Sequence, residues 1–179
     1  SRADSLERAE INFDPLRDAQ ENVYIKEHTF PGSGLYQICI TDPNRNGNIL
    51  NIDNGNSVLV PFAIQTTLRI SAAVKRNSSV VFENGCLQDA CLYQPWVYNP
   101  GAVDPNGDSL SYSLVPSMGA NCASFVPGFY KYPNEIGPAS GVISPNPAQN
   151  LSIDSQTGTI IWEVPQRLGE YNIAILVEE

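Results

Sequence analysis

One short pattern occurs twice in this sequence, and it constrains the fold more than any other feature. Residues 34–40 read Gly-Leu-Tyr-Gln-Ile-Cys-Ile and residues 169–175 read Gly-Glu-Tyr-Asn-Ile-Ala-Ile. Each copy follows a proline by a few residues and then alternates strictly, which predicts a half-buried strand. A tyrosine placed near a strand start in a β-sandwich often hydrogen-bonds to the backbone just upstream. Two copies of this tyrosine corner predict two copies of one fold.

The rest of the chain also predicts strands. Its 13 glycines and 14 prolines separate short runs that are rich in Val, Ile, Thr and Tyr. These runs cover residues 23–30, 48–52, 58–70, 79–83, 95–98, 109–115, 150–153 and 159–164. No comparable stretch has a helical period, apart from a short turn or arm over residues 4–10. We therefore expect an all-β protein.

A polar stretch over residues 71–79 predicts a boundary between two modules, 1–75 and 76–179. The turn-forming residues 42–48 predict a hairpin that joins the Tyr36 strand to residues 48–52. The first module has few strands before Tyr36, and the second ends soon after the Tyr171 strand. We expect the first module to be incomplete at its N-terminus and the second to lack its last strand.

Three motifs in the second module resemble one known family. Residues 104–114 read Asp-Pro-Asn-Gly-Asp-Ser-Leu-Ser-Tyr-Ser-Leu, residues 153–162 run from Ile-Asp through Thr-Gly to Ile-Ile-Trp, and Gly169-Glu170-Tyr171 follows. In this order they resemble the bacterial cadherin-like, or putative immunoglobulin, repeat over residues 80–179. Asn106 stands where that family usually has Asp. Residues 29–36 and 41–46 of the first module resemble polycystic-kidney-type immunoglobulin-like repeats.

The pair of modules is similar to repeats in large, gliding-motility-associated surface proteins of gliding bacteria, which are exported by type IX secretion. This resemblance implies two tandem immunoglobulin-like or cadherin-like β-sandwiches on the bacterial cell surface. It also implies a non-catalytic extracellular role in adhesion or spacing. The implied partners are neighbouring repeats of the same polypeptide and a cell-surface protein or glycan.

One loop carries a candidate calcium site. Asp104, Asn106 and Asp108 place oxygen-bearing side chains at alternate positions around Gly107, a spacing by which loops bind Ca²⁺. Such a site would need further ligands, for which Asp154, Glu178 and Glu179 are the candidates. The alternative is a polar turn in which Asp104 and Asp108 bind backbone amides. Asp154 is also expected to start a turn in which Gly158 takes a positive φ. Trp162, on the strand after this turn, is expected to pack into the core.

Aromatic residues suggest a second kind of site. Trp96, Tyr130 and Tyr132 are candidate ligand-binding residues, because flat aromatic faces stack on sugar rings, although aromatics at strand positions more often form core. Two of them fall in a Pro- and Gly-rich insertion over residues 116–149, and long insertions often carry function. The alternative function is therefore a carbohydrate-binding accessory module of a secreted hydrolase. A third possibility is an accessory domain of an exported protease.

Four cysteines, without a C-x-x-C pair, indicate disulfides and an oxidising compartment. Cys91 and Cys122 flank the Tyr112 strand, so we expect them to pair. Cys39 and Cys86 then pair across the module boundary or stay free.

Charge and hydropathy exclude two classes of partner. A net charge of −9 without a basic cluster disfavours nucleic acid. The longest apolar runs, such as residues 173–177, are too short for insertion into a membrane as a helix. No motif supplies a poised base or nucleophile, so we do not expect an enzyme.

Overall fold

The computed structural model describes residues 7–15, 19–73, 77–122, 129–143 and 150–179. The chain divides into two compact units, Ser1–Gly34 and Leu35–Glu179. The described residues form short strands and single 3₁₀ turns, which confirms the all-β class. No helix among them is long and apolar enough to cross a membrane.

Eleven strands and four 3₁₀ turns lie within the described ranges. The strands are β1 (Glu7–Asp14), β2 (Ala19–Ile25), β3 (Gly34–Asp42), β4 (Phe62–Ile70), β5 (Val81–Phe82), β6 (Trp96–Tyr98), β7 (Ala102–Val103), β8 (Ser111–Val115), β9 (Leu151–Ile153), β10 (Ile160–Trp162) and β11 (Ala174–Glu178). The 3₁₀ turns are η1 (Asp53–Gly55), η2 (Ser57–Leu59), η3 (Ala120–Cys122) and η4 (Pro133–Glu135).

The first unit contains an antiparallel hairpin of β1 and β2, with a register shift between Arg8 and Glu10. The expected helical turn over residues 4–10 is wrong where the structure describes it, because residues 7–10 belong to β1. Good helix formers at these positions pair with β2 instead, so tertiary pairing overrides local helix propensity.

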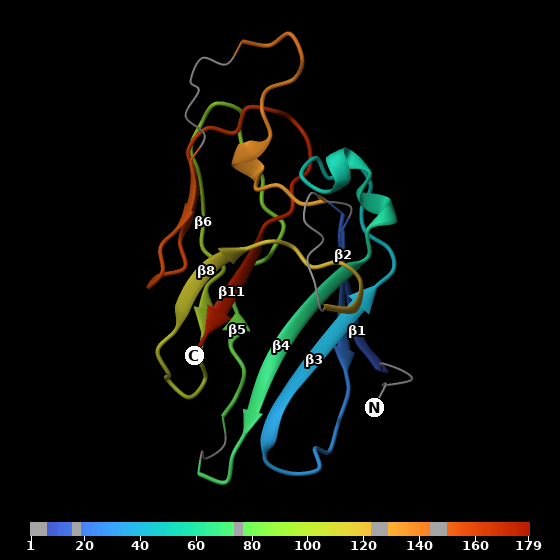
Figure 1. The fold of residues 1–179 in the computed structure, drawn as a ribbon, viewed down its shortest axis with the longest axis vertical. Helices are drawn as coiled ribbons and strands as arrows, with labels where there is room; N and C mark the ends of the chain where they lie inside the picture. Colours follow the sequence, from blue (N-terminus) through green and yellow to red (C-terminus); the bar gives the residue numbers. More distant parts are fainter. Residues whose placement is uncertain (1–6, 16–18, 74–76, 123–128, 144–149) are drawn as a thin grey trace. The chain divides into compact units, whose positions relative to one another are not determined.

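The second unit contains four small sheets. β3 pairs with β4 and β8 with β11, while β6, β10 and β9 form a three-stranded sheet and β5 pairs with β7. Figure 1 shows β3 and β4 as two long strands side by side. The Tyr36 strand therefore pairs with β4 and not with residues 48–52. In a strand, the side chains on one face recur at every second residue. Ile49 and Ile52 are both buried but lie three residues apart, and this spacing suits a turn.

Asn51 links distant parts of the second unit. Its side chain is 1% exposed, and its Nδ2 donates to the carbonyl oxygens of Lys131 at 2.9 Å and Asn172 at 2.8 Å. The amide of Asn172 donates back to Asn51 Oδ1 at 2.9 Å. Ile49, Ile52 and Tyr130 form a core cluster beside it. These contacts cross the expected module boundary at 75/76, and the structure does not confirm two tandem sandwiches.

The tyrosine corner of the second copy is present. Tyr171 Oη donates to the carbonyl oxygen of Arg167, four residues upstream, at 2.8 Å. The Tyr171 ring packs edge-on against Trp162, which is 3% exposed, as expected for a core residue. The predicted strand over residues 169–175 starts later than expected, since β11 begins at Ala174. Residues 169–172 turn toward Leu50 and Asn51 instead.

The turn between β9 and β10 also follows the sequence. Asp154 Oδ1 accepts the amide protons of Gln156 and Thr157, and these bonds hold the pKa of the Asp154 carboxyl below its usual range. Gly158 has φ +72°, as predicted. A Cβ at this position would lie 2.7 Å from Tyr112 Cε1.

Gly158→Ala is therefore expected to destabilise the protein by about 2–4 kcal/mol, through left-handed strain and overlap with the Tyr112 ring. Urea denaturation measures this loss. Gly141→Ala is the matched control, since Gly141 has φ +81° and no neighbour within 4 Å. Equal losses in the two variants would show that the Tyr112 contact contributes nothing.

Candidate functional site

The loop after β7 closes on a buried carboxylate. Asp104 Oδ1 accepts the amide protons of Asn106 at 2.7 Å and Asp108 at 3.1 Å. The amide of Gly107 donates to the carbonyl oxygen of Asp104, which completes the turn. Asp104 is 8% exposed. Its second oxygen, Oδ2, is buried and has no hydrogen-bond partner among the described residues.

Three carboxylates meet at this loop. One oxygen each of Asp104, Asp108 and Glu179 lie within 4.8 Å of one another. Two oxygens that bind one Ca²⁺ at about 2.3–2.6 Å lie at most about 5 Å apart, so this spacing fits a shared calcium ion. Like charges at this distance repel each other, and a buried carboxylate oxygen without a donor is costly. A divalent cation would offset both penalties.

A neighbouring segment reaches the same loop. Asn77 Nδ2 donates to Glu179 Oε2, and the amide of Ser78 donates to Asn106 Oδ1 at 2.7 Å. The site therefore joins the segment after β4, the loop after β7 and the end of β11. A cation bound there would brace three parts of the second unit.

The structure brings together part of the ligand set named from the sequence. Asp104 and Asp108 lie together, and Glu179 is the additional carboxylate that joins them. Asp154 lies outside this group because its Oδ1 caps its own turn. Glu178 lies outside it as well. Direct binding of Asn106 to a cation stays a prediction.

The three aromatic candidates do not form one exposed platform. Trp96 is half-buried and stacks on Tyr98, with ring centroids 5.7 Å apart. Tyr130 is 8% exposed, belongs to the core cluster and packs edge-on against Tyr132. The Tyr130 ring therefore has little free face for a sugar.

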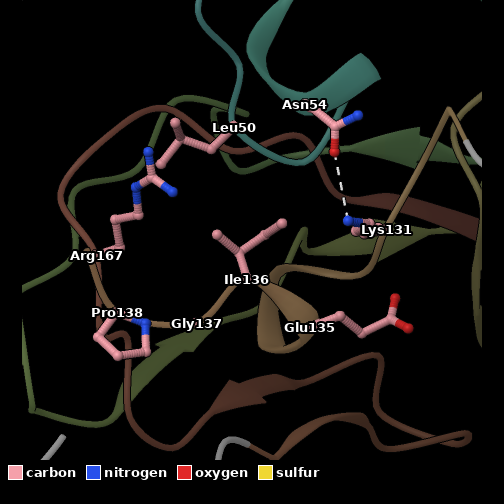
Figure 2. Close-up of a pocket in the computed structure, with 8 residues that line it drawn as sticks. All are labelled: Leu50, Asn54, Lys131, Glu135, Ile136, Gly137, Pro138 and Arg167. Atoms are coloured by element: carbon pink, nitrogen blue, oxygen red, sulfur yellow. Dashed lines mark hydrogen bonds between the residues drawn. The ribbon is translucent and has the colours of Figure 1, made fainter. Parts of the chain in front are cut away.

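A polar cavity of about 230 Å³ opens beside η4. Figure 2 shows Arg167 and Lys131 on opposite sides of it, with Ile136 between them. Lys131 Nζ donates to Asn54 Oδ1 at 3.4 Å. None of the described residues that line the cavity is aromatic, so it lacks the stacking face that sugar-binding sites use.

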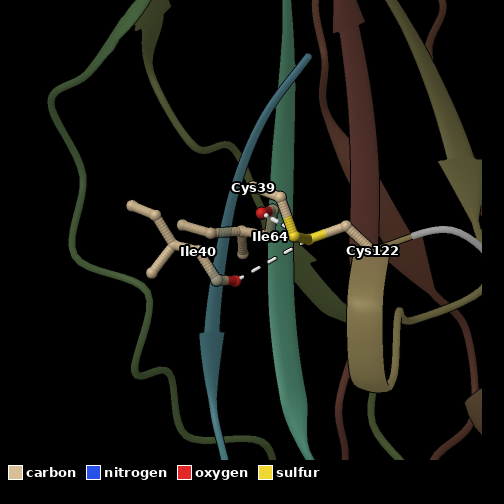
Figure 3. Close-up of a disulfide and its surroundings, with 4 residues drawn as sticks. All are labelled: Cys39, Ile40, Ile64 and Cys122. Carbon is tan, nitrogen blue, oxygen red and sulfur yellow. Dashed lines mark hydrogen bonds between the residues drawn. A yellow bond between two sulfur atoms is a disulfide. The ribbon is translucent and has the colours of Figure 1, made fainter. Parts of the chain in front are cut away.

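The disulfide differs from the expected pairing. Cys39 on β3 bonds to Cys122 in η3, with their Cα atoms 5.9 Å apart (Figure 3). Cys122 Sγ lies 3.1 Å from the carbonyl oxygen of Ile64 on β4. This is a close contact, since a disulfide sulfur has no proton to donate. The bond is compatible with an oxidising compartment.

The expected pairs Cys91–Cys122 and Cys39–Cys86 are therefore wrong. The Cys91–Cys122 pairing assumed that the segment before β6 runs beside β8, and Cys39 and Cys86 were the two cysteines left over. Instead, β8 pairs with β11, and the chain after β8 crosses to β4 through a bridge between Met118 and Ala63. This crossing carries Cys122 to β3. Cys86 and Cys91 are exposed free thiols.

Sequence reasoning missed two features of this unit. It placed Arg45 at the tip of a hairpin, where a side chain is normally exposed, whereas Arg45 is buried and only 8% exposed. It also treated residues 77–78 as part of a linker, whereas they contact the acidic loop. No local sequence signal reveals the burial of Arg45 or the contacts of residues 77–78, because both depend on residues far along the chain.

Comparisons of the chain with protein-family models, curated proteins and solved structures found no match.

Proposed function

We propose that this chain is a non-catalytic module of an extracellular surface protein, which acts in adhesion or spacing and is stabilised by calcium. The observations that carry the proposal are the meeting of carboxylate oxygens from Asp104, Asp108 and Glu179 within 4.8 Å of one another, and the buried Asp104 Oδ2, which has no hydrogen-bond partner among the described residues. Carboxylate oxygens are the ligands that Ca²⁺ prefers, and extracellular calcium is abundant enough to fill weak sites.

The module is proposed to belong among the cadherin-like repeats that its three motifs resemble, on the surface of a gliding bacterium that uses type IX secretion. Its partners would be neighbouring repeats of the same polypeptide and a surface protein or glycan. A cation that braces three segments suits a spacer, because it limits their relative motion.

Thermal unfolding in calcium and in EDTA tests this proposal. A ligand at about 100 times its dissociation constant adds about 2.7 kcal/mol, which corresponds to a rise in Tm of roughly 5–10 °C. Asp104→Asn is expected to abolish this rise. In EDTA the same variant is expected to melt at or above the wild type, because Asn keeps the Oδ1 acceptor and removes one repelling charge.

Asp89→Asn is the matched control, since Asp89 is an exposed carboxylate outside the cluster. It is expected to keep the full calcium response. A wild-type Tm that is the same in calcium and in EDTA would refute calcium stabilisation. A calcium-dependent rise in Tm that persists in Asp104→Asn would show that calcium binds at another site.

A further inference from the structure

The walls of the polar cavity beside η4 come from segments that are far apart in the sequence. It is lined from the stretch around η1, from within residues 131–138 and by Arg167. Buried Asn51 holds the second segment, because its Nδ2 donates to the carbonyl oxygen of Lys131 and its own carbonyl oxygen accepts the amide proton of Lys131 at 3.0 Å. The tyrosine corner holds the backbone at Arg167. The backbone that carries the lining side chains is therefore fixed by hydrogen bonds.

The lining of this cavity carries more positive than negative charge, although the whole chain has a net charge of −9. The described part of the second unit contains four Lys or Arg residues, which are Arg45, Arg69, Lys131 and Arg167. Two of them line the cavity, together with one carboxylate, that of Glu135. This carboxylate already has a partner, since Glu135 Oε2 accepts the amide proton of Tyr132.

Neither positive side chain of the cavity is paired with a carboxylate in the described part of the chain. The Arg167 guanidinium has no hydrogen bond there, and Lys131 Nζ has a single long one, to Asn54 Oδ1 at 3.4 Å. Arg167 and Lys131 are both exposed, so a ligand can reach them. A guanidinium suits a carboxylate because its planar fork makes two parallel hydrogen bonds. The cavity therefore offers two accessible donors to an anion.

The position of these two side chains limits the shape of the anion. Arg167 and Lys131 lie on opposite sides of the cavity, and the apolar side chain of Ile136 lies between them (Figure 2). Leu50 and Pro138 add further apolar lining. The volume of about 230 Å³ exceeds the roughly 150 Å³ in which a protein cavity holds benzene, so a short aliphatic chain fits. A matching ligand has a negative group at each end and an apolar middle.

We propose that this cavity binds a small aliphatic dicarboxylate, with one carboxylate on Arg167, the other on Lys131 and the methylene chain over Ile136. A monocarboxylate would engage only one of the two cations, and a single phosphate would place all its charge at one end. The cavity shares no residue with the candidate calcium site, so binding of the diacid does not depend on calcium.

Titration calorimetry at low salt tests the proposal in calcium-free buffer without EDTA, because EDTA itself carries carboxylates. The probes are succinate, glutarate, adipate and pimelate, which differ in the number of methylene groups between the two carboxylates. One chain length is expected to bind best, with one-to-one stoichiometry. Its monomethyl ester keeps the chain and removes one charge, and it is expected to bind at least about tenfold more weakly.

Charge variants test the placement of the two carboxylates. Arg167→Gln and Lys131→Gln are each expected to bind the best diacid about tenfold more weakly, since each variant keeps one cation. Arg69→Gln, at an exposed position on β4, removes the same charge elsewhere and is expected to leave binding unchanged. Gly137→Asp adds a carboxylate to the cavity wall. A Cβ at Gly137 would meet nothing within 4 Å, so this variant is expected to fold and to lose binding.

Three results would overturn the proposal. They are the absence of saturable binding by all the diacids, equal affinity for the best diacid and its monomethyl ester, and unchanged binding in Arg167→Gln or Lys131→Gln. An equal loss of affinity in Arg69→Gln would also overturn it, because net charge alone would then explain the binding. Circular dichroism shows whether each variant is folded, and if Gly137→Asp is not, the exposed charge variants decide the question.

Discussion

Replacement of both Cys39 and Cys122 by Ala is expected to lower the free energy of unfolding by about 4–5 kcal/mol. The disulfide closes a loop with a sequence separation of 83 residues. In the chain-entropy account, a loop of this length restricts the unfolded chain by about 4.6 kcal/mol. Since small proteins are stable by only about 5–15 kcal/mol, this loss removes a large part of the total. Guanidinium denaturation of the two proteins measures it.

The exposed cysteines provide the control. The double variant Cys86→Ala and Cys91→Ala removes two thiols that the structure leaves unpaired, so it is expected to change stability by less than about 0.5 kcal/mol. A reductant should destabilise the wild type and this control equally. If the control loses as much stability as the variant without Cys39 and Cys122, the assigned pairing is wrong.

Asn51→Ala is expected to cost about 3–5 kcal/mol. The side chain of Asn51 makes three hydrogen bonds, to Lys131 and to both backbone groups of Asn172, at a position that is 1% exposed. Removal of the amide leaves these buried backbone groups without partners, and each such group costs about 1–3 kcal/mol. Chemical denaturation followed by tryptophan fluorescence measures the loss.

Asn56→Ala is the matched control, because Asn56 is exposed and belongs to the same stretch of 3₁₀ turns. It is expected to stay within about 0.5 kcal/mol of the wild type. An Asn51→Ala variant as stable as this control would show that the side chain of Asn51 contributes little to the link between residues 130–132 and residues 170–172.

Local chemistry made part of this fold predictable. The positive φ of Gly158, the capping by Asp154 and the backward hydrogen bond of Tyr171 all depend on residues within four positions of each other. Such short-range features follow from the turn and side-chain preferences of the residues themselves. The same reasoning marked the loop of Asp104 and Asp108 as a candidate site, but it left Asp154, Glu178 and Glu179 as alternatives for the further carboxylate, and only the structure places Glu179 beside the loop.

The pairing of distant segments was not predictable in the same way. Cys39 and Cys122 are 83 residues apart, and their pairing depends on the crossing of the chain from β8 to β4. Arg45 resembles an exposed turn residue until Val60, Pro61 and Met118 surround it. A short alternation pattern cannot specify which strand lies beside which, so long-range contacts require the structure.

An anomalous difference map from crystals grown with calcium tests the proposed metal site most directly. We expect one peak within about 2.3–2.6 Å of oxygens from Asp104, Asp108 and Glu179. In this position the ion would contact the buried Asp104 Oδ2, which has no donor among the described residues. A map without a peak there, in which Asp104 Oδ2 accepts a hydrogen bond from a protein group, would contradict the account.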